Sequence, residues 1–359
     1  LALIVRIKQY KNKIKAFLLN KYIFLYLLFI FSLIITSLIH FHGVSTVVGL
    51  RSYLFASLFI FFVYFININF KNINFIFKYT MIVSTIFAFV AIYQYYIDEA
   101  FLWDFFVNSK YASSSLLEVE EGVANYRTIS LIGHPNNLGL FLAMGSIISF
   151  VYMFDSRHKL SYFSYFLINI IGLLTTGTRM SLLSLLVGIL FYLHYRFKRR
   201  NKIRIVFLIF FITTIITILY SGFGDRFSNI NIITNPRINT WITIFLELKN
   251  PFILMFGQGI GHHLESVGLK TIDSSLIEML REGGVFVLVI FTTFIYKILF
   301  SKVVNSYYLK HILLLRGVSI VLLMQMLTNS FLTSLFGYYL WFCFGILIVL
   351  LSSRKNKIV

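Results

Sequence analysis

Long apolar segments alternate with short polar segments along most of the chain. Ten apolar segments are found, at residues 22–41, 46–66, 79–97, 136–154, 160–176, 180–195, 204–221, 284–300, 312–330 and 335–351. Most are close to the length of about 20 residues that an α-helix needs to cross a bilayer. Helices are the expected form, because they satisfy backbone polar groups where lipid offers no water. The pattern predicts an all-α, polytopic transmembrane helical bundle of about ten spans, with residues 1–359 forming a single integral membrane domain.

Composition agrees with a chain embedded in lipid and changes the meaning of its positive charge. Hydrophobic residues make up 58% of the sequence and charged residues 13%, whereas soluble domains contain about 25% charged residues. A net charge of +19 would suggest a nucleic-acid partner for a soluble protein. In a membrane protein, however, Lys and Arg concentrate in cytoplasmic loops. We therefore expect membrane lipids, and no nucleic acid, as partners.

The distribution of cations predicts an orientation. If the N-terminus is cytoplasmic and there are ten spans, 22 of the 32 Lys and Arg residues lie inside and eight lie outside. This asymmetry follows the positive-inside rule. The sequence thus predicts a multi-pass protein with both termini in the cytoplasm.

Two outside loops are long enough to carry a site, namely residues 98–130 and 222–283. Twelve of the 13 acidic residues fall in outside segments, so both loops have mixed charge. The second loop exceeds an ordinary connection, and loops of such length are usually functional or disordered. Its apolar positions from Trp241 to Leu248, followed by Pro251, predict a helix lying along the membrane surface.

The first candidate constellation combines Arg127 with the segment His134-Pro135-Asn136-Asn137. A proline and two asparagines read as a polar turn before a helix, with Asn136 or Asn137 as its cap. The alternative is a turn that faces substrate, in which Arg127 and Asn136 contribute to substrate binding.

Arg179 stands between two apolar segments with almost no loop around it. An arginine so close to the hydrocarbon is costly unless it reaches the headgroups or finds an anion. One interpretation is therefore snorkelling. The other is a guanidinium that holds a phosphate, because its planar fork matches phosphate oxygens.

The richest constellation lies in the second outside loop. Gly257, Gly259 and Gly261 permit a tight turn and a close approach of backbone N–H groups to an anion. Arg237 lies upstream as a candidate anion holder, and His262 directly follows as a candidate base. The alternative is a solvated loop whose histidines have no role.

Two further outside residues are candidates. Asp273 is a candidate acceptor for the proton of a sugar hydroxyl or a candidate cap, while Ser274 is the preferred cap of the following helix. Arg281 is included among the substrate-binding candidates, although pairing with Glu282 or marking the membrane boundary are the alternatives. Histidine and cysteine spacing typical of a metal site is not found. We therefore expect a metal-independent protein without a cofactor.

The order of these motifs resembles the Wzy-type O-antigen and capsular polysaccharide polymerases, which share a superfamily with the O-antigen ligases. Three stretches carry the resemblance: Pro-Asn-Asn-Leu-Gly at 135–139, Thr-Gly-Thr-Arg-Met-Ser-Leu-Leu at 176–183, and the region from Arg237 to Gly284. Many relatives, the ligases especially, have His-Asn where this chain has Asp273-Ser274. That departure leaves the base open and favours a polymerase over a ligase.

The resemblance implies a glycosyltransferase reaction at the outer face of the bacterial inner membrane. A glycan on undecaprenyl diphosphate would be transferred to a sugar hydroxyl of another lipid-linked repeat unit. Arg179 and Arg237 would hold the leaving diphosphate, and Asp273 or His262 would take the proton. Trp241 would stack on a sugar face, although anchoring at the interface is its more common role. A partner that regulates chain length is also implied.

Two other functions remain as alternatives. An O-antigen ligase would pass the glycan to lipid A core and differs only in its acceptor. A lipid-linked sugar flippase or other transporter should place ionisable groups at mid-span. Here most ionisable groups lie in predicted loops rather than at mid-span, which favours an enzyme.

Overall fold

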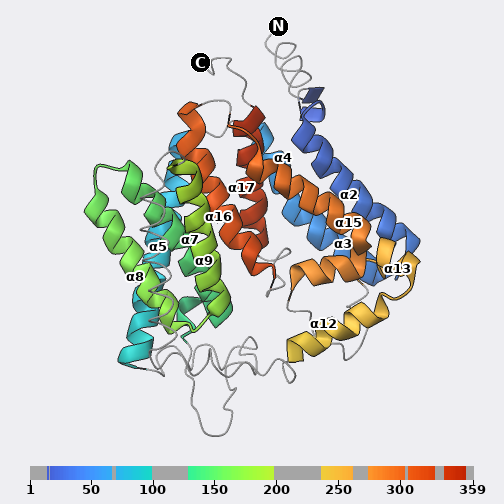
Figure 1. Cartoon of the computed structure of the whole chain (residues 1–359), viewed down its shortest axis with the longest axis horizontal. Helices are drawn as coiled ribbons and strands as arrows, with labels where there is room; N and C mark the ends of the chain where they lie inside the picture. The colour runs from blue at the N-terminus through green and yellow to red at the C-terminus, as the bar shows by residue number, and fades with distance from the viewer. Residues whose placement is uncertain are drawn as a thin grey trace. The chain divides into compact units, whose positions relative to one another are not determined.

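The structure is a computed structural model that describes residues 14–15, 17–66, 70–98, 128–197, 236–261, 274–303, 306–327 and 335–352. Regular secondary structure within these residues is entirely helical, and they contain no strand (Figure 1). The prediction of an all-α fold is confirmed.

Six helical segments of the described part are long and apolar enough to cross a membrane. They are Lys21–Ile39, Val44–Phe65, Lys71–Tyr96, Pro135–Phe154, Ser275–Phe300 and Leu335–Ser352. This finding supports the membrane class. The predicted spans at 160–176, 180–195 and 312–330 correspond to the helices Lys159–Thr175, Arg179–Arg196 and Leu309–Gln325, which are not among the six. The predicted span at 204–221 lies outside the described residues. The count of ten spans is therefore not confirmed and stays a prediction.

The chain divides into two compact units, which are described separately. Unit 1 comprises Leu1–Asn67, Ile230–Leu315 and Met326–Val359. Its helices are α2 (Lys21–Ile39), α3 (Val44–Ser57), α4 (Phe59–Phe65), α12 (Pro236–Glu247), α13 (Pro251–Phe256), α15 (Ser275–Phe300), the 3-10 turn η4 (Ser306–Tyr308) and α17 (Leu335–Ser352). Helix α16 (Leu309–Gln325) begins in this unit and ends in the other.

Aromatic rings form the core of unit 1. Helix α15 runs alongside α2, and α17 packs on α4 (Figure 1). Trp341 of α17 is almost fully buried. Its ring centroid lies about 6 Å from those of five other rings, which belong to Tyr26, Phe29, Phe291, Phe294 and Phe344. The rings join α2, α15 and α17 into one frame.

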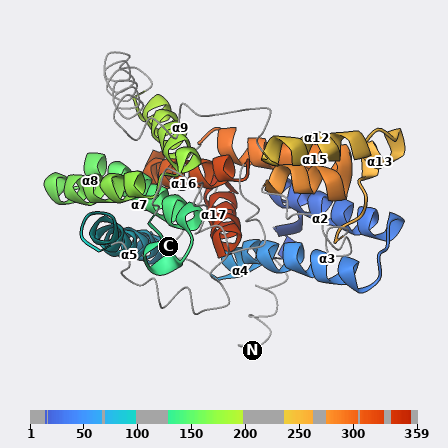
Figure 2. The same cartoon turned by 90° about the horizontal axis from the view of Figure 1, so that it is seen from below.

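Unit 2 comprises Ile68–Asn229 and Arg316–Gln325. Its helices are α5 (Phe70–Tyr96), the 3-10 turn η2 (Ser130–Ile132), α7 (Pro135–Asp155), α8 (Lys159–Thr175) and α9 (Arg179–Arg196), together with the second part of α16. Helix α7 is central and packs against α5, α8 and α9, as Figure 2 shows from below.

Small and polar residues bring the helices of unit 2 close together. A Cβ on Gly172 of α8 would lie 2.8 Å from the Cα of Ala88 on α5, so the two backbones are in contact through residues without bulk. The Asn169 amide of α8 donates to the Thr85 hydroxyl of α5 at 2.9 Å, and both side chains are buried. Such hydrogen bonds stabilise helix pairs where neither partner has access to water.

Candidate functional site

Two short helices of unit 1, α12 and α13, carry the middle of the second predicted outside loop. The predicted helix around Trp241 is confirmed as α12, and the Asn250 side chain caps α13 by accepting from the Phe252 N–H at 2.9 Å. Ile244 of α12 and Leu248, which directly follows the helix, are buried and pack against Ile253, Ile277 and Leu280. The amphipathic helix is thus held on α13 and α15.

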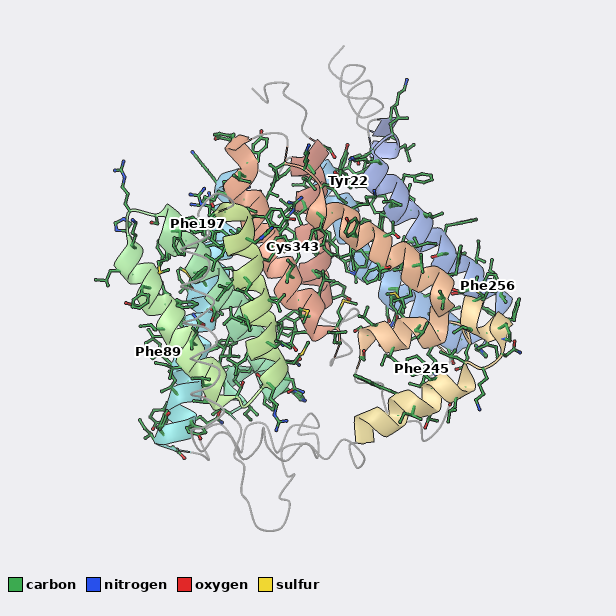
Figure 3. All side chains as sticks on the ribbon, in the orientation of Figure 1. Tyr22, Phe89, Phe197, Phe245, Phe256 and Cys343 are labelled. Carbon is green, nitrogen blue, oxygen red and sulfur yellow. The ribbon has the colours of Figure 1, made fainter. Side chains whose placement is uncertain are left out.

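The opposite face of α12 is apolar and exposed. Ile242, Phe245 and Leu246 are all more than half exposed, and Figure 3 shows Phe245 on α12 and Phe256 at the end of α13. Trp241 is half-buried. These side chains have the character that an interfacial helix presents to lipid, which is consistent with the predicted surface location.

The glycine loop that follows α13 lies against the middle of α15. Gly257, Gly259 and Gly261 all have positive φ, a conformation that glycine adopts readily in tight turns. The N–H of Gln258 donates to the Arg281 carbonyl at 2.8 Å, and the N–H of Gly259 donates to the Glu282 carbonyl at 3.0 Å. The loop and α15 are therefore joined by their backbones.

The loop amides bind protein rather than an external anion in this structure. The Gly257 N–H donates to the Ile253 carbonyl at 2.7 Å, and the Gly261 N–H donates to the Glu282 carboxylate at 2.9 Å. The predicted contact of Gly257 and Gly259 with a substrate phosphate stays a prediction. It would require these amides to exchange their present acceptors.

A kink in α15 makes this arrangement possible. Gly284 has φ 69° and ψ −176° inside the helix. A Cβ on Gly284 would lie 2.4 Å from the Met255 carbonyl oxygen, and a Cβ on Gly257 would lie 2.2 Å from the Glu282 carbonyl oxygen. Glycine is needed on both sides, because the two backbones leave no room for a side chain.

Arg281 lies at the kink and is buried, with 2% of its surface exposed. Its Nε donates to the Gln258 Oε1 at 2.9 Å, and its Nη2 lies 3.3 Å from the Glu247 Oε2. Gln258 Nε2 also donates to the Glu247 Oε2, at 3.3 Å. Arg281 thus pairs with Glu247 at the end of α12 and not with Glu282, the partner suggested by the sequence.

Glu282 is buried next to Arg281, with 1% exposure. Besides the Gly261 N–H, its carboxylate accepts from the Tyr53 hydroxyl of α3 at 3.4 Å. The loop before α3 contributes as well, since His42 Nε2 donates to the Gln258 carbonyl at 2.7 Å. Burial lowers the pKa of neighbouring His40, and His42 adds to this effect.

Five of these side chains were missed as functional candidates: Tyr53, His42, Glu247, Gln258 and Glu282. Among the five, the sequence offered a reason to select only Glu247 and Glu282. Acidic side chains are rare in this chain and need a partner when they are buried. The partners themselves lie up to 229 positions away in the sequence.

Arg179 belongs to unit 2 and is the first residue of α9, where it is half-buried. It follows a group of buried hydroxyls. The Thr128 and Thr175 hydroxyls lie 3.0 Å apart, and those of Thr176 and Thr178 lie 2.7 Å apart. Ser181 Oγ accepts from Gln325 Nε2 of α16 at 2.7 Å. Polar side chains thus surround the turn that carries Arg179.

The predicted cap of α7 was wrong. The N-cap is His134, whose Nδ1 accepts from the Asn136 N–H at 3.2 Å, and Pro135 occupies the first turn. Proline suits this position because its missing N–H would have no intrahelical acceptor there. Asn136 and Asn137 lie one and two residues further into the helix.

Several candidates lie outside what the structure describes. Arg127, His262 and Asp273 are not among the described residues. The backbone of Arg237 belongs to α12, but its side chain is not described. In the described ranges, no group of three or more His, Cys, Asp or Glu side chains is placed to hold a metal ion.

The predicted cap of α15 is confirmed. Ser274 is the N-cap, and its hydroxyl accepts from the Ile277 N–H at 3.4 Å. The same hydroxyl donates to the Met326 carbonyl at 3.1 Å. Ser274 therefore connects the start of α15 to the segment that follows α16.

We expect Ser274→Ala to lower the stability of the protein by about 1 kcal/mol, the usual cost of losing a helix N-cap. Ser274→Thr keeps the hydroxyl and should retain most of the stability. The measurement is the fraction of detergent-solubilised protein that stays monodisperse after heating. Equal curves for wild type and Ser274→Ala would contradict the capping role.

The fold and the polar cluster at the kink of α15 define a class: a helical protein with apolar helices of membrane-spanning length and a polar cluster holding an amphipathic helix. Comparisons of the sequence with protein-family models and with curated proteins find no match.

Proposed function

We propose that this protein is a polymerase of bacterial surface polysaccharide. It joins undecaprenyl-diphosphate-linked oligosaccharide repeat units into O-antigen or capsular polysaccharide at the outer face of the inner membrane. In this proposal the chain crosses the membrane about ten times, both termini are cytoplasmic, and residues 222–283 form the large periplasmic loop. The order of the sequence motifs and the asymmetry of the Lys and Arg residues support it.

One observation contributes most to this proposal. A short amphipathic helix that begins at Pro236 and Arg237 is joined by an ion pair from Glu247 to the buried Arg281 of α15, an apolar helix of membrane-spanning length. In the proposed orientation the Ser275 end of α15 faces the periplasm. An arginine in the first turn of a helix held there suits a substrate whose diphosphate lies at the membrane surface.

The proposed reaction transfers a glycan from one lipid carrier to another. The acceptor sugar hydroxyl attacks the anomeric carbon of the donor glycan and forms a new glycosidic C–O bond. The C–O bond to the diphosphate breaks, and undecaprenyl diphosphate leaves with the electron pair. His262 or Asp273 takes the proton of the hydroxyl. A guanidinium, that of Arg237 or Arg179, stabilises the charge on the leaving diphosphate.

The test is gel electrophoresis of surface polysaccharide from a strain in which the gene is deleted and then restored. A polymerase predicts that deletion leaves lipid A core with a single repeat unit, and that the wild-type gene restores the ladder. Bare core with polymer accumulating on its carrier lipid would indicate a ligase instead. Bare core with single repeat units on the carrier would indicate a flippase, and an unchanged ladder would exclude all three.

A further inference from the structure

Three side chains form a closed polar network at the kink of α15. Arg281 of α15, Gln258 of the glycine loop and Glu247 of α12 each contact the other two. The Arg281 side chain is 3% exposed and that of Glu247 is 30% exposed. Breaking a buried ion pair costs more than forming it gains, because the remaining charge is left without a partner. The network therefore opposes separation of α12 from α15.

This network fixes the position of α12, the helix that carries Arg237 in its first turn. Helix α12 is 12 residues long, so Glu247 and Arg237 are connected by a continuous helix of about 15 Å. Ile244 and Leu248 fix which face of the helix turns towards α15. The ion pair with Arg281 then fixes the end of the helix, and a rigid helix transmits that position to its first turn.

The neighbouring Glu282 holds the glycine loop, residues 257–261, which leads to His262. Its carboxylate accepts from the N–H of Gly261, which directly precedes His262. Its carbonyl accepts from the N–H of Gly259. The Tyr53 hydroxyl donates to the other carboxylate oxygen, so the carboxylate is itself held in place from α3.

We infer that Arg281 and Glu282 are positioning residues, which together hold the helix that bears Arg237 and the loop that leads to His262. This inference rests on the proposed function for the roles of Arg237 and His262. It assigns Arg281 to positioning rather than to substrate binding, because the guanidinium is buried and contacts Gln258 and Glu247, which belong to two other segments.

The Arg281 contact is tested by the distance between spin labels on α12 and α15. Phe245→Cys and Val289→Cys are both exposed sites in unit 1, and Cys343→Ala removes the chain's one native cysteine. We expect a single narrow distance distribution that becomes broad in Arg281→Met and in the milder Glu247→Gln. Arg281→Lys should restore it in part. The matched control is Lys249→Gln, an exposed site two residues from Glu247, which should leave the distribution narrow.

The Glu282 contact is tested by hydrogen exchange of the segment 257–261. We expect Glu282→Ala to remove protection of the Gly261 amide. Glu282→Gln should keep it, because the amide oxygen still accepts from that N–H. Faster exchange in the alanine variant alone would support the contact, while unchanged protection in both variants would overturn it.

Kinetics on lipid-linked repeat units separate positioning from binding. A misplacement of about 1 Å can reduce turnover about 100-fold, so Arg281→Met and Glu282→Ala should lower kcat while KM stays close to that of wild type. A raised KM with unchanged kcat and a narrow label distance would make Arg281 a substrate contact and overturn the inference. If wild-type protein transfers no repeat units, the proposed function fails. The spin-label distances and the hydrogen exchange still test the contacts of Arg281 and Glu282 in that case.

Discussion

Replacing Arg237 with alanine is expected to slow the transfer of repeat units by about 100- to 1,000-fold. Removing one preorganised charge contact to a group that gains negative charge in the transition state costs about 2.7–4 kcal/mol. Arg237→Lys should recover part of the rate, because it keeps the charge but lacks the planar fork that binds two phosphate oxygens. The alanine variant should still fold, since Ile244, Glu247 and Leu248 hold α12 near its other end.

The measurement is polymer formation from lipid-linked repeat units by membranes that contain equal amounts of each variant. Arg157→Ala serves as the control, because it removes an exposed arginine between α7 and α8 on the predicted cytoplasmic side. Its rate should equal that of wild type. A wild-type rate for Arg237→Ala at equal protein level would remove Arg237 from the proposed mechanism.

Local features of the fold were readable from the sequence because their causes are local. Apolar segments of membrane-spanning length predicted the helices, and the apolar positions from Trp241 to Leu248, followed by Pro251, predicted α12. Ser274 was correctly identified as a cap, since its hydroxyl binds an N–H only three residues away. In each case the residues that decide the structure are neighbours in the chain.

The cap of α7 shows how two local rules compete. Asn136 and Asn137 are strong capping residues, and the pattern of asparagines suggested that the helix begins there. Proline at the first helical position shifts the start towards the N-terminus, so that the preceding His134 becomes the cap. Giving the proline precedence over the asparagines would have predicted the boundary.

The polar cluster at the kink of α15 could not be predicted, because its contacts are distant in sequence. Tyr53 and Glu282 are 229 residues apart, and His42 and Gln258 are 216 residues apart. The partners of the glycine loop are also distant in sequence and could not be predicted. The sequence predicted a tight turn at Gly257, Gly259 and Gly261, which all have positive φ, but it associated their amides with an external anion. The structure pairs the Gly261 amide with the protein's own carboxylate, Glu282.

Gly257→Ala is expected to destabilise the protein by about 2–5 kcal/mol. Two costs contribute, and the same substitution at a second glycine, Gly43, separates them. A side chain at positive φ costs about 1–2 kcal/mol, and overpacking of a filled site costs about 1–3 kcal/mol more. The Cβ at position 257 would lie 2.2 Å from the Glu282 carbonyl oxygen, whereas the Cβ at Gly43, where φ is 62°, has nothing within 4 Å. Gly43→Ala therefore carries the backbone cost alone. In detergent, the midpoint of thermal loss of monodisperse protein should fall much further for Gly257→Ala than for Gly43→Ala. Equal shifts in the two variants would mean that the loop does not lie against α15 as closely as the structure places it.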